Sequence, residues 1–317
     1  MKTILKKVSL VVVIILVAII VIGLAIWGID GRSPQAIIVR SMLSQMTMQM
    51  YENGMADNTD KSVTEIPASV QFPREVSQFK VGNMQVFEVK AEDDTKPIVL
   101  YIHGGAYANN FSVNHWDAMA EWAEMTGCGI VAPNYLLLPL HTAKEAHPLM
   151  IQLYQQLVKQ YSAKRIIIMG DSAGGGFTLA LAQQVKAMGI DLPRHLVLIS
   201  PWVDVMGGDP ALQDKDNWLT IEVLQKIGEK WANDIKVNDP MISPLYGDMK
   251  GLPPTDLYTG TWEILYTDVV STYDKMKEAG VDAQLHVSKK MGHVYPLWPC
   301  PEGKTARKQI AKIINGD

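Results

Sequence analysis

The stretch Ile166-Ile167-Ile168-Met169-Gly170-Asp171-Ser172-Ala173-Gly174 carries the strongest structural signal in the chain. Its apolar start predicts a buried strand, and the spacing of apolar residues in Gly174–Met188 predicts a helix directly after it. A G-x-S-x-G turn between a strand and a helix is so sharp that the serine takes a strained backbone conformation and exposes its hydroxyl. The glycines remove Cβ atoms that would collide with neighbouring backbone. Ser172 is therefore a candidate nucleophile, and a strand–helix turn without chemistry is the alternative.

Around this turn, short apolar segments alternate with longer helical segments. The expected strands are Ile98–Ile102, Gly129–Pro133, Ile166–Met169, Leu196–Ile199, Asp256–Thr259 and Gln284–Val287. The expected helices are Trp116–Thr126, Ala143–Tyr161, Gly174–Met188 and Val269–Gly280. Strands that alternate with helices, several of them nearly continuous apolar runs, predict a largely parallel α/β sheet with helices on both faces. We expect this domain to span residues 76–317.

Two segments depart from the alternation. Ser33–Met55 has helical spacing and is rich in methionine, and residues 204–249 contain an expected helix at Leu219–Trp231. We expect residues 31–75 and 204–249 to pack together as a cap over the ends of the strands. The methionines have two interpretations: ordinary filling of the core, or a deformable apolar wall for acyl chains.

A second glycine-containing loop, His103-Gly104-Gly105-Ala106-Tyr107, follows the strand at Ile98–Ile102. Glycines let backbone N–H groups approach a substrate carbonyl closely. Gly104, Gly105 and Ala173 are therefore the predicted donors to an oxyanion. A phosphate-cradling loop is the competing interpretation, but no Lys-Ser/Thr pair follows. His103 itself is expected to have a structural role.

A nucleophilic serine also needs a base and an orienting carboxylate. For nucleophiles on a strand–turn–helix, the chain order is serine, then acid, then histidine. His293 lies in a loop after the strand at Gln284–Val287, where its side chain can reach over the strand ends. His195 lies at the opposite end of its strand and His286 lies within a strand, so His293 is the candidate base.

The candidate acid is Glu263, which follows the carboxyl end of the strand at Asp256–Thr259. Asp268, five residues further along, is the alternative, although its position is more typical of a residue that starts a helix. Asp256 lies at the beginning of the strand and faces the opposite rim of the sheet.

The N-terminal 30 residues have a different composition. Val8–Trp27 is an almost wholly apolar run, and a helix of that length is about 30 Å long, enough to cross a bilayer. Lys2, Lys6 and Lys7 precede it. We therefore expect residues 1–30 to be a cytoplasmic tip and a single-pass membrane anchor, with the catalytic domain on the far side. A cleaved signal peptide and secretion are the alternative, but its apolar region would be shorter and would end at a small-x-small site.

Composition limits the remaining classes. The chain has 317 residues, a net charge of −4 and a pI near 6.0, without a basic patch, so nucleic acid is not an expected partner. Two free thiols at Cys128 and Cys300 are favoured over a disulfide, which stays open. Nothing in the spacing of ligand residues predicts a metal site, and the oligomeric state is open.

Together these motifs resemble the hormone-sensitive lipase-like family (family IV esterases) of the α/β-hydrolases, over about Pro97 to Pro296. His103-Gly104-Gly105 is similar to the family's oxyanion loop, Gly170–Gly174 to its nucleophile turn, and Gly292-His293 to its catalytic histidine. Connecting segments typical of the family are Ser200-Pro201-Trp202, Ser243-Pro244-Leu245-Tyr246 and Gly251-Leu252-Pro253-Pro254.

The sequence also departs from the family's pattern. Ala106 stands where the family usually has a third glycine, and Glu263 stands where its usual acid is Asp. The family's Asp-Tyr-Arg-Leu-Ala-Pro segment is represented by Asn134-Tyr135-Leu136-Leu137-Leu138-Pro139, which lacks the two charges. Ala106 should affect the width of the pocket more than the donor amides, and the longer Glu263 can still reach His293 if its loop adjusts. The two lost charges predict different local packing and a different pocket polarity.

The resemblance implies an α/β-hydrolase fold with a helical cap and a serine carboxylesterase that needs no cofactor. The implied substrates are short- to medium-chain acyl esters, small or lipid-like. Two other functions stay open: hydrolysis of an amide by the same residues, and ligand binding without catalysis.

Overall fold

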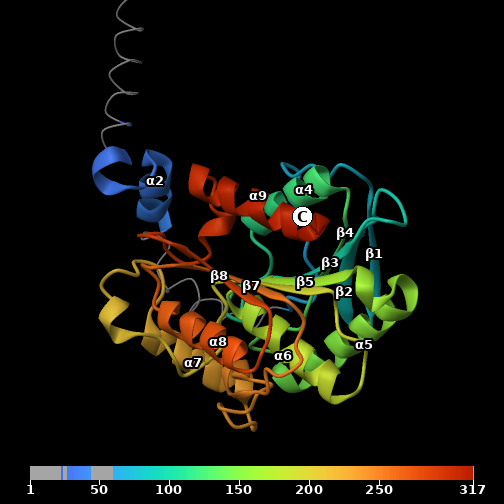
Figure 1. The fold of residues 1–317 in the computed structure, drawn as a ribbon. Coiled ribbons are helices and arrows are strands. Elements are labelled where there is room, and N and C mark those ends of the chain that lie inside the picture. Colours follow the sequence, from blue (N-terminus) through green and yellow to red (C-terminus); the bar gives the residue numbers. More distant parts are fainter. Residues whose placement is uncertain (1–22, 24–26, 44–59, 317) are drawn as a thin grey trace, which may run out of the picture.

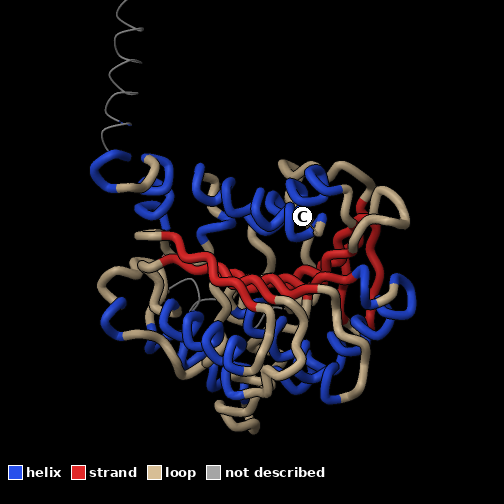
Figure 2. The backbone as a smooth tube through the Cα atoms, in the orientation of Figure 1, coloured by secondary structure: helices blue, strands red, loops and turns tan. Residues whose placement is uncertain are grey.

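The centre of the molecule is an eight-stranded sheet with the order β1-β2-β4-β3-β5-β6-β7-β8 (Figures 1 and 2). The structure is a computed structural model that describes residues 23, 27–43 and 60–316. The strands are β1 (Val76–Val81), β2 (Met84–Val89), β3 (Ile98–Ile102), β4 (Gly129–Asn134), β5 (Ile166–Asp171), β6 (His195–Ile199), β7 (Thr255–Gly260) and β8 (Ala283–Ser288). The pairs β1–β2 and β2–β4 are antiparallel and the others are parallel. The predicted largely parallel sheet is confirmed.

The predicted strands correspond to β3 through β8. Strands β3 to β7 are nearly wholly buried, and β3 to β6 are largely apolar, as expected where helices cover both faces of a sheet. Strand β5 is longer than predicted, because Gly170 and Asp171 still pair with β6. The strand therefore delivers the chain directly to Ser172.

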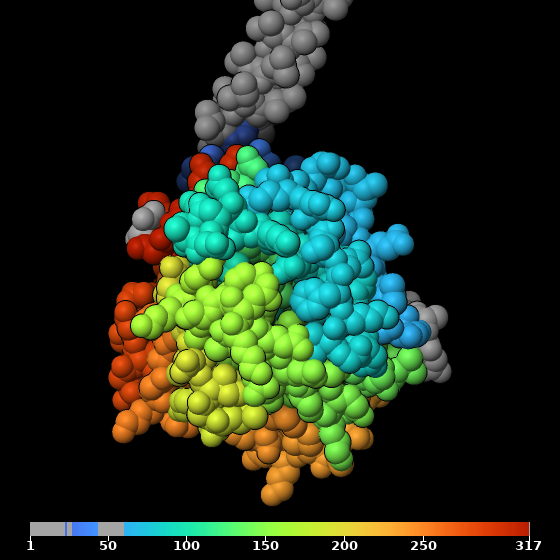
Figure 3. Space-filling view, turned by 90° about the vertical axis from the view of Figure 1, so that its right-hand side faces the viewer, coloured from blue at the N-terminus to red at the C-terminus, as the bar shows by residue number. Residues whose placement is uncertain are grey.

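The antiparallel hairpin β1–β2 was not predicted. Strand β1 lies at the edge of the sheet, and its Ser77, Gln78 and Lys80 are exposed. A strand that contacts solvent on one side lacks the continuous apolar run that identified the buried strands. Figure 3 views this edge, with the hairpin (blue to cyan) beside the helix α5 (green).

Helices form a layer on each face of the sheet (Figure 1). The layer around α6 contains α5 (Ala143–Tyr161), α6 (Ala173–Ala187), α7 (Ile221–Ala232) and α8 (Tyr266–Glu278). The opposite layer contains α2 (Pro34–Leu43), α4 (Val113–Thr126) and α9 (Pro301–Asn315). The predicted helices appear as α4, α5, α6 and α8, whereas α9 was not predicted.

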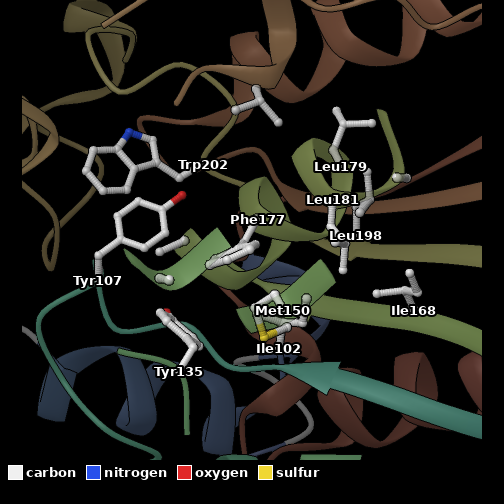
Figure 4. Close-up of a cluster of buried hydrophobic side chains, with 14 of the residues drawn as sticks. Ile102, Tyr107, Tyr135, Met150, Ile168, Phe177, Leu179, Leu181, Leu198 and Trp202 are labelled. Atoms are coloured by element: carbon white, nitrogen blue, oxygen red, sulfur yellow. The ribbon is translucent and has the colours of Figure 1, made fainter. Parts of the chain in front are cut away.

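The larger core lies between the sheet and α6. Figure 4 shows Ile102, Ile168 and Leu198 from three neighbouring strands, packed with Phe177 of α6 and Met150 of α5. These side chains are at most 1% exposed. Burial of each contributes roughly 1.5–3 kcal/mol. This packing holds α6, and with it the turn at Ser172, rigidly against the sheet.

The insertion at residues 204–249 contains α7, which begins at Ile221 rather than at the predicted Leu219 because Thr220 is its N-cap. The insertion contacts α2: Asn217 Nδ2 donates to the Arg40 carbonyl at 2.7 Å, and Arg40 donates to the Lys215 carbonyl. The two segments predicted to form a cap therefore touch each other.

The N-terminal predictions lie mostly outside the described residues. Of the expected anchor Val8–Trp27, the structure describes Gly23 and Trp27, and of the expected helix Ser33–Met55 it describes the part up to Leu43. Across the residues that are described, no helix combines the length and the apolar character needed to cross a membrane. Cys128 and Cys300 are free and buried, which confirms the prediction of two free thiols.

Candidate active site

Ser172 occupies a strained turn between β5 and α6. Its φ is 51° and its ψ is −122°, outside the regions that residues with a Cβ ordinarily adopt. A Cβ on Gly174 would lie 2.0 Å from the Ile102 carbonyl oxygen, and one on Gly170 would lie 2.4 Å from the Gly174 carbonyl oxygen. Glycine is therefore required at both positions. The predicted sharp turn with a strained serine is confirmed.

The structure brings the three predicted residues Ser172, His293 and Glu263 into one hydrogen-bonded chain. His293 Nε2 lies 2.8 Å from Ser172 Oγ, and His293 Nδ1 lies 2.6 Å from Glu263 Oε2. The side chains of His293 and Glu263 are 2% and 0% exposed. An ionised carboxylate at Nδ1 requires a proton on that nitrogen, which leaves Nε2 to accept the serine proton.

Each of these side chains comes from a loop at the carboxyl end of a strand. Ser172 follows β5, Glu263 follows β7 and His293 follows β8. Because these strands are parallel and lie on one side of the sheet, their carboxyl ends meet at the same rim. The fold thus assembles residues that lie far apart in the chain.

The Glu263 carboxylate is held by donors on its other oxygen. Oε1 accepts from Thr259 Oγ1 at 2.5 Å, from the Gly260 amide at 2.9 Å and from Ser200 Oγ at 2.9 Å. Oε2 is consequently directed to His293. Neither Ser200 nor Thr259 was assigned a role from sequence, although Ser200 belongs to the Ser200-Pro201-Trp202 motif.

The alternative acid, Asp268, contacts the insertion instead. It lies in the first turn of α8, where Oδ2 accepts from the Gly208 amide at 2.8 Å. Burial, together with Asp204 and Asp209 nearby, raises the pKa of Asp268 to about 6. Its position agrees with the expectation of a helix-starting residue.

In the glycine loop after β3, one of the three predicted oxyanion donors, the Gly104 amide, is wrong. The Gly104 amide donates to Asp171 Oδ1 at 3.0 Å, so it is already engaged within the protein. A Cβ on Gly104 would lie 2.3 Å from Asp171 Oδ2, which explains the glycine by close packing. Gly105, with φ of 115°, borders the cavity beside Ser172, and Ala173 is the first residue of α6. Gly105 and Ala173 are therefore the remaining donors of the predicted set.

Asp171, the residue before the serine, holds this loop through hydrogen bonds to its buried side. Besides Gly104 it accepts from Tyr101 Oη at 2.7 Å and contacts His115 Nε2 at 3.2 Å. Burial alone would raise the pKa of Asp171, but His115, Tyr101 and the Gly104 amide hold it below its ordinary value. The sequence offered one signal for this role, namely its place inside the G-x-S-x-G turn.

His103 is part of the scaffold, as expected. Its ring stacks on Tyr135 at 4.5 Å and packs against Phe111 at 4.1 Å, and its Nδ1 lies 2.6 Å from the Gly104 carbonyl. Burial lowers the pKa of His103 to about 3, so it is neutral near pH 7. Tyr107 in the same loop stacks on Trp231 of α7 at 4.3 Å. The insertion thereby braces the glycine loop.

A cavity of about 340 Å³ opens beside Ser172 and His293. Its apolar lining consists of Val39, Leu43, Phe111, Trp218, Val294, Leu297 and Trp298. Its polar lining includes Asn109, Asn110, Ser112 and Asn114. Of the methionines predicted to form an acyl wall, Met42 is 63% exposed, and Met46, Met48, Met50 and Met55 lie outside the described residues.

Residues 99–297 match the family described as having the alpha/beta hydrolase fold. The chain belongs to the α/β-hydrolase family. A similar protein is an esterase of Acinetobacter venetianus, 31% identical over 246 residues, which are 75% of this chain and 81% of the relative. A triacylglycerol lipase of Mycobacterium tuberculosis is 35% identical over 188 residues, which are 59% of this chain but 39% of the lipase.

Solved structures place this α/β-hydrolase within the hormone-sensitive lipase-like branch. An esterase from the bacterial hormone-sensitive lipase family superposes with a TM-score of 0.77 at 26% identity, over 90% of this chain and 98% of the esterase. The family match and the similarity to these esterases together show that this α/β-hydrolase is an enzyme that acts on carboxylic esters.

Proposed function

We propose that this α/β-hydrolase cleaves carboxylic esters through a Ser172–His293–Glu263 triad and an acyl-enzyme intermediate. The observation that carries the proposal is the unbroken chain of hydrogen bonds from Glu263 through His293 to Ser172, at 2.6 and 2.8 Å. A nucleophile, a base within hydrogen-bond distance and a group that orients the base are the three parts such chemistry needs.

The reaction follows from these positions. Ser172 Oγ attacks the ester carbonyl carbon while His293 Nε2 takes the serine proton. The bond to the alcohol oxygen then breaks, and His293 returns the proton to the leaving alcohol. Water repeats both steps on the acyl-enzyme and releases the acid. Glu263, fixed through its Oε1 contacts, holds the required tautomer and stabilises the imidazolium.

The Gly105 and Ala173 amides are the proposed donors to the oxyanion. Ala173 follows the nucleophile at the start of α6, where helix amides lack intrahelical partners. Donors fixed in advance stabilise developing negative charge without reorganisation during the reaction. Removal of one such donor costs about 10²–10³ in turnover.

The proposed substrates are short- to medium-chain acyl esters with a cap that limits chain length. Support comes from the cavity of about 340 Å³, which is at the lower end for small-molecule sites and is lined largely by apolar side chains. Val39 and Leu43 from residues 31–75, and Trp218 from residues 204–249, border this cavity. The segments proposed as the cap therefore contribute to the wall that an acyl chain would meet.

The test is ester hydrolysis by the full-length chain in detergent, with p-nitrophenyl esters of increasing acyl length. We expect activity that falls as the acyl chain outgrows the cavity. Ser172→Ala should lower turnover by about 10⁶. Ser271→Ala, at a partly exposed serine of α8 whose hydroxyl donates to the Thr267 carbonyl, is the matched control and should be unchanged. Matched anilides are included: faster anilide cleavage would indicate an amide hydrolase, and no cleavage of either would indicate ligand binding.

We also propose that Val8–Trp27 anchors the enzyme in the cell membrane with the catalytic domain outside the cytoplasm. The support is the length of the apolar run and the lysines that precede it. Protease added to intact cells should then remove the catalytic domain. Degradation that occurs only after lysis would contradict this orientation, and a secreted, shortened chain would indicate cleavage.

A further inference from the structure

Asp216 lies in the insertion and binds backbone groups of two distant segments. Its Oδ1 accepts from the amides of Trp218 and Leu219, both at 3.0 Å. Its Oδ2 accepts from the Ile264 amide at 2.9 Å, across 48 positions of the chain. The residue is 5% exposed. One carboxylate therefore joins the insertion to the loop between β7 and α8.

Both segments that Asp216 holds touch the proposed triad. The Trp218 ring lies edge-on to the His293 ring, with the centroids 5.6 Å apart, and it borders the cavity. Ile264 directly follows Glu263, the partner of His293. The hydrogen bonds of Asp216 consequently constrain the packing on one side of the imidazole and the backbone next to its carboxylate.

An ionised Asp216 would also interact electrostatically with the nearby His293. Among the described residues, Asp216 forms no ion pair with a Lys, Arg or His side chain. Burial raises the pKa of Asp216, while the backbone amides and the nearby His293 oppose that effect. An ionised carboxylate here would attract a proton to His293.

Other aspartates in the insertion show what an ordinary turn residue does. Asp239 Oδ1 accepts from the Met241 amide two positions along, and the residue is exposed. Such a contact stabilises a local turn. Asp216 differs because it is buried and because one of its oxygens reaches a second element.

We propose that Asp216 is a positioning residue for the catalytic histidine, one that fixes Trp218 and the Glu263 loop around His293 and favours the protonated imidazole. The inference rests on the proposed triad. In the reaction, His293 carries a positive charge after it takes the serine proton, so both effects stabilise the same state.

The main test is Asp216→Asn in the full-length enzyme, with kcat, KM and the pH profile of kcat/KM measured on a p-nitrophenyl ester. Asn keeps the size but loses the charge and one acceptor. We expect kcat to fall about 10-fold with little change in KM. The midpoint of the acid limb should move to lower pH by about 0.5–1 unit, because removing a negative charge disfavours the protonated imidazole. Asp239→Asn should change neither quantity.

Several titratable groups surround His293, and the variants are chosen to distinguish the effect of Asp216 from the effects of these groups. Glu263 contacts it from the β7–α8 loop, and Tyr295 lies in its own loop. His115 and Asp171 border the same cavity and contact each other. Arg40 of α2 interacts electrostatically with Asp216. These groups are unchanged in Asp216→Asn, so a shift of the acid limb is assigned to Asp216.

Asp216→Glu separates the effect of the charge from that of the geometry. It is also the variant used to test the proposal if Asp216→Asn does not fold. It keeps the negative charge on a longer side chain, so kcat should fall while the acid-limb midpoint stays near that of the parent enzyme. An unchanged kcat in both variants would show that Asp216 is an ordinary turn residue and would overturn the proposal. Equal pH profiles with a lower kcat in Asp216→Asn would overturn its electrostatic part.

A readout without turnover distinguishes failure of this inference from failure of the proposed function. A protonated imidazole quenches the fluorescence of a neighbouring indole. The emission of Trp218 is obtained as the difference between the enzyme with and without Trp218→Phe, and its dependence on pH reports the protonation of His293. In a Ser172→Ala background, Asp216→Asn should lower the midpoint of this quenching. If the wild type hydrolyses no ester but the midpoint moves, the proposed function is wrong and the coupling of Asp216 to His293 stands. If the wild type is active and the midpoint is unmoved, the coupling is wrong.

Discussion

Ser200 Oγ donates to Glu263 Oε1 at 2.9 Å and accepts from the Val294 amide at 3.0 Å. Glu263 and the residue after His293 are thereby joined by one buried hydroxyl. Ser200 itself has φ of 44°, an uncommon backbone conformation at the end of β6. The acid loop and the histidine loop are thus aligned by a side chain that takes no part in proton transfer.

Replacement of Ser200 by Ala should disturb this alignment. The Val294 amide loses its buried acceptor and Glu263 loses one donor, so the free energy of unfolding should fall by about 1–3 kcal/mol. We expect kcat to fall about 10-fold, because the Glu263–His293 pair is less well oriented. Urea unfolding and ester kinetics measure the two effects, with Ser271→Ala, at a partly exposed serine, as the control. A full-rate, fully stable Ser200→Ala enzyme would show that the hydroxyl is dispensable.

Glu263→Gln should reduce kcat by about 10³–10⁴. The three donors at Oε1 select the amide oxygen for that side, which directs the amide NH₂ toward His293 Nδ1 and disfavours the working tautomer. Glu263→Asp keeps the charge but is one methylene shorter, so its loss should be smaller. Glu222→Gln, at an exposed Glu paired with Lys226, is the control. Equal rates for Glu263→Gln and the wild type would exclude Glu263 as the acid.

Asp171→Asn should weaken the oxyanion loop without moving the triad. An Asn side chain keeps one oxygen to accept from Gly104 and Tyr101, as Oδ1 does, but it loses the negative charge and replaces the Oδ2 that contacts His115 with an NH₂ group. We expect kcat to fall about 10- to 100-fold. Affinity for a trifluoromethyl ketone, whose adduct carries an oxyanion, should fall with it. Asp117→Asn on the exposed face of α4 is the control, and unchanged inhibitor affinity would contradict the role given to Asp171.

Asp256, on the rim of the sheet opposite the active site, should make a pH-dependent contribution to the stability of the fold. Its carboxylate contacts His195 Nε2 at 2.7 Å and His286 Nε2 at 2.5 Å. Burial acts to raise the pKa of Asp256, but the two histidines lower it to about 2. A lowered folded-state pKa stabilises the fold above about pH 4, and this contribution is lost as pH falls toward 2.

Asp256→Asn should accordingly lower the free energy of unfolding by about 1–2 kcal/mol at pH 7. The difference from wild type should narrow as the pH of the urea titration is lowered from 4 to 3. Asp94→Asn, at an exposed site, provides the comparison. A difference that is constant or grows toward acid would show that the Asp256 contacts do not depend on its ionisation.

Local signals predicted the elements that carry the chemistry. The buried strands β3 to β6 could be predicted because apolar runs are nearly continuous where both sheet faces are covered. Strand β1 of the edge hairpin was not predicted because its exposed face is polar. Strand β2 is buried, but Gln85 and Glu88 interrupt its apolar run. Helix α9 was not predicted either, although its Ile310 and Ile314 are wholly buried. Its buried positions recur at helical spacing, but Gly303, Ala306, Arg307 and Ala311 among them are small or charged and give a weak apolar signal.

The sequence by itself determined the strand–turn–helix at Ser172, because only glycines fit the close contacts at Gly170 and Gly174. Chain order and strand ends also identified Glu263 and His293. Only the tertiary structure decided which amides are engaged and which polar side chains support the site. Gly104 donates to Asp171, Ser200 bridges two loops, and Asp216 reaches the Ile264 amide. Hydrogen bonds between segments far apart in the chain depend on how the parallel strands align their ends, and no local pattern records that alignment.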